Sequence, residues 1–155
     1  MPLQDHVVRL AKGVNLATVV TLMPDGRPQA QYTWIDTDGE YLLVNTVPDR
    51  QRYKNVQRDP RITVLIPGDH PWDYVEVRGH VIDTVGGQEA LDHIDFLARK
   101  YLGADSYPNP IGPGGRVILK IAADKVNARA GEDQRLTAKN RPSDQPNSGT
   151  TTELP

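Results

Sequence analysis

A run of basic residues is the most chemically suggestive feature of this sequence. Arg50, Arg52 and Lys54 lie on one short segment, and Arg58 and Arg61 follow closely. The segment is the start of a predicted helix, where the macrodipole already places partial positive charge and further cations are unfavourable. An anion would offset this repulsion, and phosphate accepts paired hydrogen bonds from arginine and from free helix N–H groups. The cluster therefore indicates a site for a phosphorylated ligand.

The same basic cluster has a second interpretation. Arg50, Arg52 and Lys54 stand at positions i, i+2 and i+4, and residues with this spacing do not share one face of a helix. They could therefore form a solvated helix surface with no ligand. The spacing alone leaves both interpretations open.

Aromatic side chains form a second candidate group. Their flat rings could wall a pocket for a planar heterocycle. The main candidates are Trp34, Trp72 and Tyr74, and the secondary candidates are Tyr32 and Tyr53. Packing in the core or at a dimer interface is the alternative for each ring.

Other kinds of reactive site have little support. The sequence contains no cysteine, and its 4 histidines show no HExxH arrangement. The Gly-rich segment 112–115 lacks the ending of a Walker motif and the spacing of a Rossmann fingerprint, and no GxSxG motif indicates a hydrolase. An enzyme of this composition would depend on a bound cofactor for its reactive atom.

Length and charge restrict the class of protein. The chain has 155 residues, with 18 Lys and Arg against 20 Asp and Glu, which gives a net charge of −2. This is the size of one domain. A near-neutral balance argues against nucleic-acid or polybasic membrane binding, and no apolar run approaches the roughly 20 residues of a membrane span. We therefore expect a cytoplasmic protein with neither kind of partner.

The elements that must position these residues are mainly strands. The pattern predicts helices over 2–12, 49–58 and 87–102, with Gly13 ending the first and Asp49 capping the second. Turns are expected at 23–26 and 36–39, and a bulge at Gly79. Predicted strands cover 16–22, 27–35, 40–46, 61–66, 74–85 and 116–122, the last of which 126–128 could continue. Six or seven strands without regular βαβ alternation favour a mostly antiparallel barrel with flanking helices.

The order of these segments resembles the pyridoxamine 5′-phosphate oxidase-like split β-barrel superfamily, in particular its deazaflavin (coenzyme F420)-dependent branch. The resemblance covers residues 3–128. It implies a mainly β (α+β) fold of the FMN-binding split-barrel type, with a cofactor-binding domain over residues 1–130. Its most specific part is a block between two strands, present here as Arg50, Arg52, Asn55, Val56, Arg58, Asp59, Pro60 and Arg61.

The remaining residues, 131–155, are expected to form a disordered polar tail. From Lys139 onward Leu154 is the only large apolar residue, so burial cannot offset the entropy of ordering this segment. Deleting residues 139–155 should therefore leave the melting temperature and ligand binding nearly unchanged.

The resemblance also assigns site residues. It implies that Arg50 and Arg52 hold the cofactor phosphate, with Lys54 and Asn55 assisting. It places two further groups near the ring system, one on the strands and one in a loop across a dimer interface. These are Gln31, Thr33, Asn45 and Thr46 on the strands, and Trp72 and Tyr74 in the loop.

The function implied by the resemblance is hydride transfer in a homodimer with two sites at the subunit interface. Reduced coenzyme F420 would reduce a conjugated, electron-poor small molecule such as an enone, a quinone or a linear tetrapyrrole. No catalytic residue is assigned. One alternative replaces coenzyme F420 with FMN in an oxidase or reductase. The other is a non-catalytic protein that binds a cofactor or a tetrapyrrole.

Overall fold

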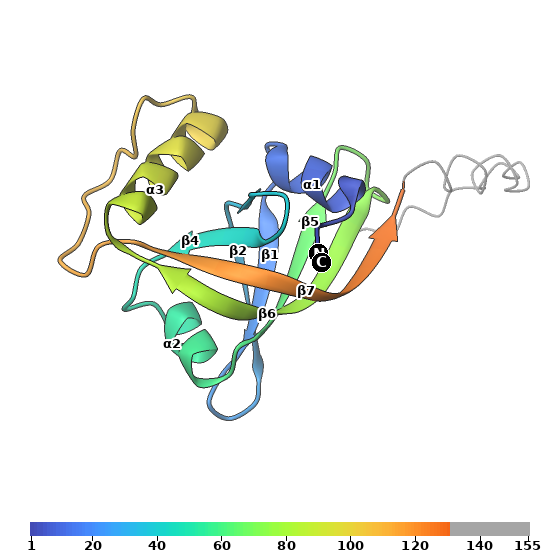
Figure 1. The fold of residues 1–155 in the computed structure, drawn as a ribbon, viewed down its shortest axis with the longest axis horizontal. Coiled ribbons are helices and arrows are strands. Elements are labelled where there is room, and N and C mark those ends of the chain that lie inside the picture. Colours follow the sequence, from blue (N-terminus) through green and yellow to red (C-terminus); the bar gives the residue numbers. More distant parts are fainter. Residues whose placement is uncertain (131–155) are drawn as a thin grey trace, which may run out of the picture.

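The computed structural model describes residues 1–130, and the tail prediction lies outside this range. The described part is mainly β, as expected, with helices on the flanks (Figure 1). The helices are α1 (Asp5–Lys12), α2 (Gln51–Arg58) and α3 (Gly87–Leu102). The strands are β1 (Ala17–Leu22), β2 (Pro28–Thr33), β3 (Asp36–Thr37), β4 (Leu42–Thr46), β5 (Arg61–Pro67), β6 (Tyr74–Val85) and β7 (Val117–Arg129).

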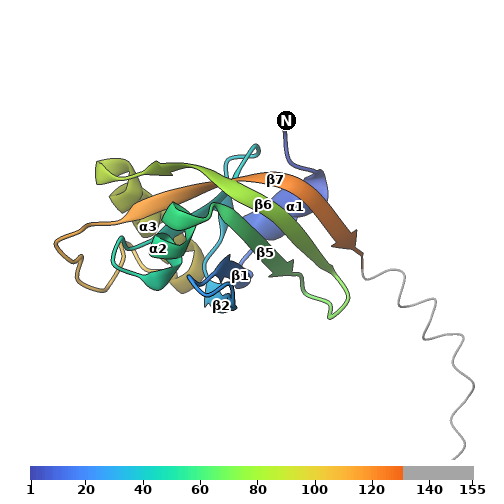
Figure 2. The same cartoon turned by 90° about the horizontal axis from the view of Figure 1, so that it is seen from below.

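All seven strands belong to one sheet. Its order is β2-β1-β5-β6-β7-β4-β3, and every neighbouring pair is antiparallel. The long strands β6 and β7 cross the molecule and curve along their length (Figures 1 and 2). Strand β2 forms one edge of the sheet and the short β3 the other. The predicted antiparallel architecture of six to seven strands is confirmed.

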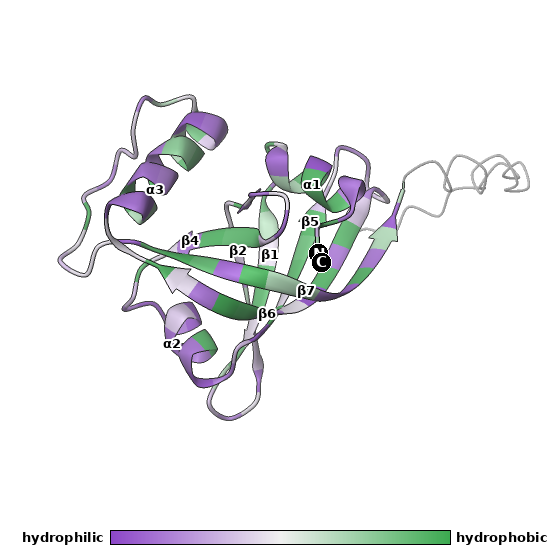
Figure 3. Ribbon diagram, in the orientation of Figure 1, coloured by the Kyte–Doolittle hydropathy of each residue, from purple (hydrophilic) through white to green (hydrophobic). Residues whose placement is uncertain are grey.

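Helix α1 closes one end of the main core. Val7, Leu10 and Ala11 are buried on one side of this helix, which has an apolar and a polar side in Figure 3. They pack against apolar side chains from the strands, and Val56 of α2 joins the same cluster. The apolar spacing of the helices thus directs one side of each toward the sheet.

Strand β4 is covered on both faces, and all of its residues are buried. Val44 belongs to the main core, whereas Leu43 packs with Ala90 of α3 and Ile118 of β7. Because strand side chains alternate between faces, β4 presents successive residues to the core and to α3.

The pairing of β6 with β7 is irregular at Gly79, where the sequence predicts a bulge, but the extra residue there is Asp124 of the partner strand β7. The register with β7 shifts between Arg78 and Gly79 and again between Val81 and Asp83. A Cβ atom at Gly79 would collide with the carbonyl oxygen of Ala122, so only glycine allows the two strands to approach this closely.

Several local predictions were wrong. Asp36 and Thr37 form β3 instead of a turn, because the turn lies later, where the carboxylate of Asp38 accepts the backbone N–H groups of Glu40 and Tyr41. The predicted continuation of the last strand through 126–128 is confirmed, because β7 runs without a break to Arg129 and its pairing with β6 resumes after each register shift.

The cap predicted at Asp49 was also wrong. Arg50 occupies the N-cap position of α2, and its side chain makes no capping hydrogen bond among the described residues. Within residues 1–130, no helix is both long enough and apolar enough to cross a membrane.

Candidate functional site

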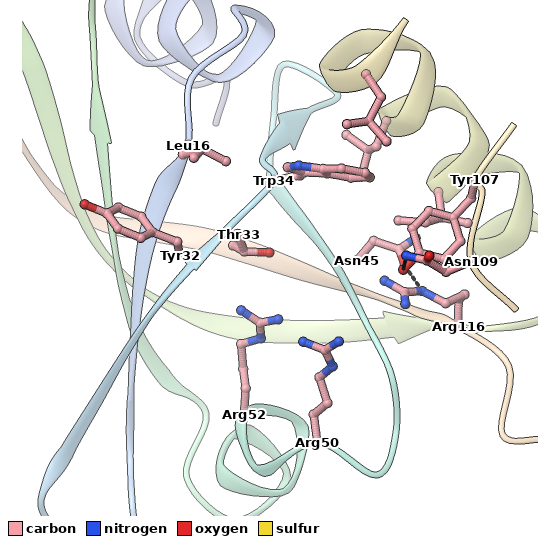
Figure 4. Close-up of a pocket in the computed structure, with 13 residues that line it drawn as sticks. Leu16, Tyr32, Thr33, Trp34, Asn45, Arg50, Arg52, Tyr107, Asn109 and Arg116 are labelled. Atoms are coloured by element: carbon pink, nitrogen blue, oxygen red, sulfur yellow. Dashed lines mark hydrogen bonds between the residues drawn. The ribbon is translucent and has the colours of Figure 1, made fainter. Parts of the chain in front are cut away.

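A cavity of about 400 Å³ lies between the end of the sheet, the start of α2, helix α3 and the loop that follows α3 (Figure 4). Its volume is in the range of small-molecule sites. One side carries arginine and polar side chains, and the other carries aromatic and aliphatic groups. This combination suits a ligand that has both an anionic and an apolar part.

Arg50 and Arg52 reach the cavity from the start of α2, and Figure 4 shows both guanidinium groups directed into it. Their i, i+2 spacing does not separate them, because Arg50 precedes the helix and has extended backbone angles of φ −72° and ψ 146°. Its side chain is therefore free of the helical spacing that would direct it away from Arg52. This geometry favours the ligand-binding interpretation of the basic cluster.

The guanidinium group of Arg52 is buried without a full set of partners. The residue is only 3% exposed. Its Nη2 lies 3.5 Å from Thr46 Oγ1, at the outer limit of a hydrogen bond. The Nε and Nη1 atoms are buried and have no hydrogen-bond partner among the described residues. Since buried polar groups are almost always paired, the guanidinium lacks an acceptor that a bound anion would supply.

The positive charges in the cavity repel one another. Burial, followed by the charges of Arg50 and Arg116, lowers the pKa of Arg52 to about 10. The pKa of Arg116 is also lowered, mainly by burial and further by Arg50. Among the described residues that line the cavity, none is acidic. The site is therefore electrostatically prepared for an anion.

Arg116 enters the cavity from the segment just before β7. Its Nε donates a hydrogen bond to Asn45 Oδ1 at 2.8 Å, the dashed line in Figure 4. Its guanidinium lies over the ring of Tyr107, 5.3 Å from the centroid. Arg116 is thus held by an amide on one side and by an aromatic ring on the other.

Trp34 forms a rigid part of the apolar side. Its ring stacks on Tyr101 with the centroids 5.2 Å apart and the planes 5° from parallel, and it meets Tyr107 edge-on at 6.2 Å. Tyr101 is itself fixed, because its hydroxyl donates to the carbonyl of Asn15 at 2.6 Å and accepts the N–H of Ile35 at 3.0 Å. Burial raises the pKa of Tyr101, so this hydroxyl keeps its proton.

The structure brings four of the predicted site residues together around the cavity. Thr33 and Asn45 line it with Arg50 and Arg52. Thr46 lies behind Arg52, as its 3.5 Å contact with Nη2 indicates.

Three other predicted residues are not among those lining this cavity. Lys54 is exposed on α2, and Gln31 is exposed on the edge strand β2. Asn55 is fully buried and binds the β1–β2 hairpin, donating to Thr21 Oγ1 at 3.1 Å and Gln29 Oε1 at 3.2 Å. These contacts give Asn55 a structural role in joining α2 to the hairpin.

The predicted aromatic pair lies at another part of the chain. Trp72 is in the β5–β6 loop, with the guanidinium of Arg129 5.6 Å from its ring centroid. Tyr74 is paired with Arg129 in the sheet register. Neither lines the cavity within one chain, so a role for them across a dimer interface stays a prediction.

Sequence reasoning did not place Arg116, Tyr107 and Asn109 in the site, although all three line the cavity. They belong to or follow a Gly- and Pro-rich connection that has no periodic pattern, so nothing local marks them as ligand-binding. Trp34 was considered only within the aromatic group. The one available signal was the cation of Arg116 directly before a buried strand.

Comparisons with known proteins identify the family and the fold of this chain. The family model described as pyridoxamine 5′-phosphate oxidase matches residues 3–130. A solved structure named F420 reductase is 27% identical over 77% of this chain and 94% of that chain, with a TM-score of 0.67. A conserved hypothetical protein from Mycobacterium tuberculosis is 21% identical, with 96% of each chain covered and a TM-score of 0.68.

A more distant structural neighbour has a different described role. The heme storage protein HutZ from Vibrio cholerae is 10% identical over 83% of this chain and 96% of that chain, with a TM-score of 0.58. At this identity the likeness concerns the fold alone. Together the matches confirm the split-barrel fold.

Proposed function

Because this chain belongs to the pyridoxamine 5′-phosphate oxidase family, we propose that it is an oxidoreductase that binds coenzyme F420 and reduces a conjugated, electron-poor small molecule. One finding supports coenzyme F420 itself, and a second supports any cofactor that joins a phosphate to a ring system. The solved structure named F420 reductase is 27% identical to this chain. The cavity also combines an arginine-rich side with an aromatic side, as a phosphate-bearing ring system requires.

The single observation that carries the proposal is the unsatisfied guanidinium of Arg52. Its Nε and Nη1 are buried and without partners among the described residues, and Arg50 and Arg116 lie near enough to depress its pKa. A phosphate group offers several acceptor oxygens and a compensating charge. The donor set of this chain therefore fits the phosphate of coenzyme F420, and equally that of FMN.

The roles of the residues follow from their positions. Arg50 and Arg52 would bind the phosphate, and Asn45 and Thr33 would border the ring system. Trp34, held by its stack on Tyr101, would wall the apolar side and exclude water. When bound, the reduced deazaflavin supplies a hydride to an electron-poor carbon of the substrate. The contribution of the protein is to bind and orient both molecules.

A homodimer is part of the proposal. Tyr32 lines the cavity yet is 77% exposed on the edge strand β2, so the cavity reaches the rim of the sheet. A second copy packed against this edge would cover the rim and complete the site. We expect light scattering to give the mass of a dimer, and Ala30→Arg, which places a charge on the same edge, to shift it toward a monomer.

FMN is the second candidate cofactor. The family match is compatible with FMN, and the arginine side chains of the cavity would bind its phosphate equally well. A non-catalytic binding protein is the third possibility for this fold. The experiment is to add enones, quinones and linear tetrapyrroles to the protein loaded with reduced coenzyme F420, and to follow reoxidation of the cofactor by absorbance.

The expected result is substrate-dependent reoxidation that the double variant Arg50→Ala/Arg52→Ala loses. Tight binding without reoxidation by any acceptor would favour a storage or carrier role. Binding of FMN alone would favour the second candidate.

A further inference from the structure

Arg116 must be held in place to act on a ligand. A free arginine side chain samples many rotamers, and the hydrogen bond from its Nε to Asn45 Oδ1 at 2.8 Å restricts this freedom. In Figure 4 the guanidinium of Arg116 lies toward the same space as those of Arg50 and Arg52. The orientation of the Asn45 amide therefore decides how the third cation of the cavity is presented.

The amide of Asn45 is fixed from both ends. Its Nδ2 donates to the carbonyl of Ala90 at 2.9 Å and to Nδ1 of His93 at 3.1 Å. Turning the amide over would bring Oδ1 against the Ala90 carbonyl and Nδ2 against the N–H of Arg116, so both contacts would become repulsive. Only the orientation with Oδ1 toward Arg116 satisfies every polar group.

His93 has one protonation state that fits these contacts. Because Asn45 donates to Nδ1, that nitrogen must be an acceptor, and the ring proton lies on Nε2. Nε2 then donates to Asp36 Oδ2 at 3.2 Å. The neutral Nε2–H tautomer satisfies both neighbours, whereas a proton on Nδ1 would oppose the amide donor of Asn45.

The charged groups around His93 come from several elements. Asp36 of β3 accepts from the ring, and Lys12 of α1 lies 3.1 Å from the other oxygen of Asp36. Burial alone would raise the pKa of Asp36, but hydrogen bonds from His93, the backbone of Thr37 and Lys12 outweigh it and lower the pKa. Lys100 of α3 also interacts with Asp36 by charge.

We propose that His93 is a positioning residue that holds Arg116 in its ligand-facing orientation through the amide of Asn45. The chain of contacts runs from Asp36 through His93 and Asn45 to Arg116, and connects α3 with the cavity. The inference rests on the proposed function for the identity of the ligand, but the positioning itself is a property of the ligand-free protein. Protonation of His93 at Nδ1 would release Asn45 and with it Arg116.

Two substitutions at His93 separate the two ring nitrogens. His93→Asn keeps an acceptor near the Nδ1 position and loses the contact with Asp36. His93→Gln keeps a donor toward Asp36 and loses the acceptor for Asn45. His80→Gln is the matched control, because His80 pairs with Asp124 at 3.0 Å on the exposed surface and does not line the cavity.

The first readout needs no ligand. Nitrogen-15 NMR of the wild-type protein should show His93 as the Nε2–H tautomer and a defined Nε–H resonance for Arg116. This resonance should shift or broaden in His93→Gln. It should persist in His93→Asn and in His80→Gln. The Nδ1–H tautomer, or an Arg116 signal indifferent to His93, would overturn the proposal.

The second readout is affinity for coenzyme F420, with FMN as the second probe. We expect His93→Gln to bind about tenfold more weakly and His93→Asn to stay within about threefold of the wild type, since one charge-assisted contact is misdirected. In an Arg116→Gln background, His93→Gln should cause no further loss.

Equal losses in the two His93 variants, or losses that add to that of Arg116→Gln, would contradict a positioning role. The melting temperature of each variant is the control for a merely structural effect. If the effect is only structural, the loss of affinity should parallel the loss of stability. If the wild type bound neither probe, the proposed function would fail, while the NMR result would still decide whether His93 positions Arg116.

Discussion

Arg52 shows at the residue scale how a ligand site can be recognised without its ligand. A guanidinium that is 3% exposed and leaves Nε and Nη1 unpaired among the described residues is unfavourable in the free protein. The depression of its pKa to about 10, caused mainly by burial, expresses the same cost. Such an arrangement contributes to stability only when an anion is bound.

Replacing Arg52 should therefore stabilise the ligand-free protein. We expect Arg52→Met to raise the free energy of unfolding by about 1–3 kcal/mol, because an apolar chain of similar length fills the space without a buried charge. Thermal denaturation in buffer without phosphate measures this change. Arg50→Met is the control and should have little effect, since Arg50 is exposed. A lower melting temperature for Arg52→Met would mean that the charge is already compensated.

At the scale of elements, two local features hold neighbouring elements together. One is the pairing of β6 with β7 at Gly79, and the other is the contact of Asp73 with α1. The close approach of β7 to β6 at Gly79, next to the extra residue Asp124 of β7, allows the two strands to stay paired across this register shift. The carboxylate of Asp73, in the β5–β6 loop, holds α1 by accepting from His6 Nε2 at 2.7 Å and from Arg9 Nη2 at 3.2 Å. Neither feature touches the cavity, so each can be tested through stability alone.

Adding a side chain at Gly79 should destabilise the fold. We expect Gly79→Ala to lower the free energy of unfolding by more than about 3 kcal/mol, because its Cβ would collide with the backbone of Ala122. Gly112→Ala is the matched control, since a Cβ at that position meets no atom within 4 Å. Chemical denaturation of both variants provides the comparison. Equal stability of the two variants would show that the backbone of β7 can shift at this point to accommodate the added Cβ atom.

The contact of Asp73 with α1 should depend on pH. Burial alone would raise the pKa of Asp73, but the bonds from His6 and Arg9 outweigh it and bring the pKa below its ordinary value of 3.8. A lowered carboxyl pKa means that the stabilisation is complete above pH 3.8 and is lost as pH falls through the folded-state value.

Asp73→Ala should therefore lower the free energy of unfolding by about 1–3 kcal/mol at neutral pH, and the difference from the wild type should shrink in acid. Melting curves from neutral pH to below 3.8 test this, with the exposed Asp92→Ala as the control. A difference that stayed constant in acid would contradict the assigned role of the charge.

For the whole molecule, local pattern predicted more of the fold than of the site. The period of apolar residues placed α3 at 87–102, where the structure has it, and Gly79 marked a register shift between β6 and β7. The block around Arg50 and Arg52 also indicated the arginine-lined end of the cavity. These features depend on neighbouring residues, which the sequence displays directly.

The rest of the cavity depends on contacts between distant segments. Arg116 and Asn45 are 71 positions apart and meet through one hydrogen bond, and Trp34 is held by Tyr101 of α3. No local pattern contains such contacts. Asn55 illustrates the converse error, because its place in the basic block indicated a ligand contact, whereas its partners belong to the β1–β2 hairpin.

In the proposed function, this cavity binds a phosphate-bearing deazaflavin through Arg50 and Arg52. The most direct measurement is a fluorescence titration of the wild type and Arg50→Ala/Arg52→Ala with coenzyme F420, FMN and riboflavin, which lacks the phosphate. Arg61→Ala serves as the control, because Arg61 is exposed and paired with Asp59 at 2.7 Å.

We predict that the wild type binds coenzyme F420 most tightly and riboflavin least. The double variant should lose about 3–6 kcal/mol of binding free energy for the phosphate-bearing ligands, since two charge-assisted contacts disappear, and Arg61→Ala should bind as the wild type does. Unchanged affinity in the double variant, or equal affinity for riboflavin and FMN, would contradict phosphate binding by Arg50 and Arg52.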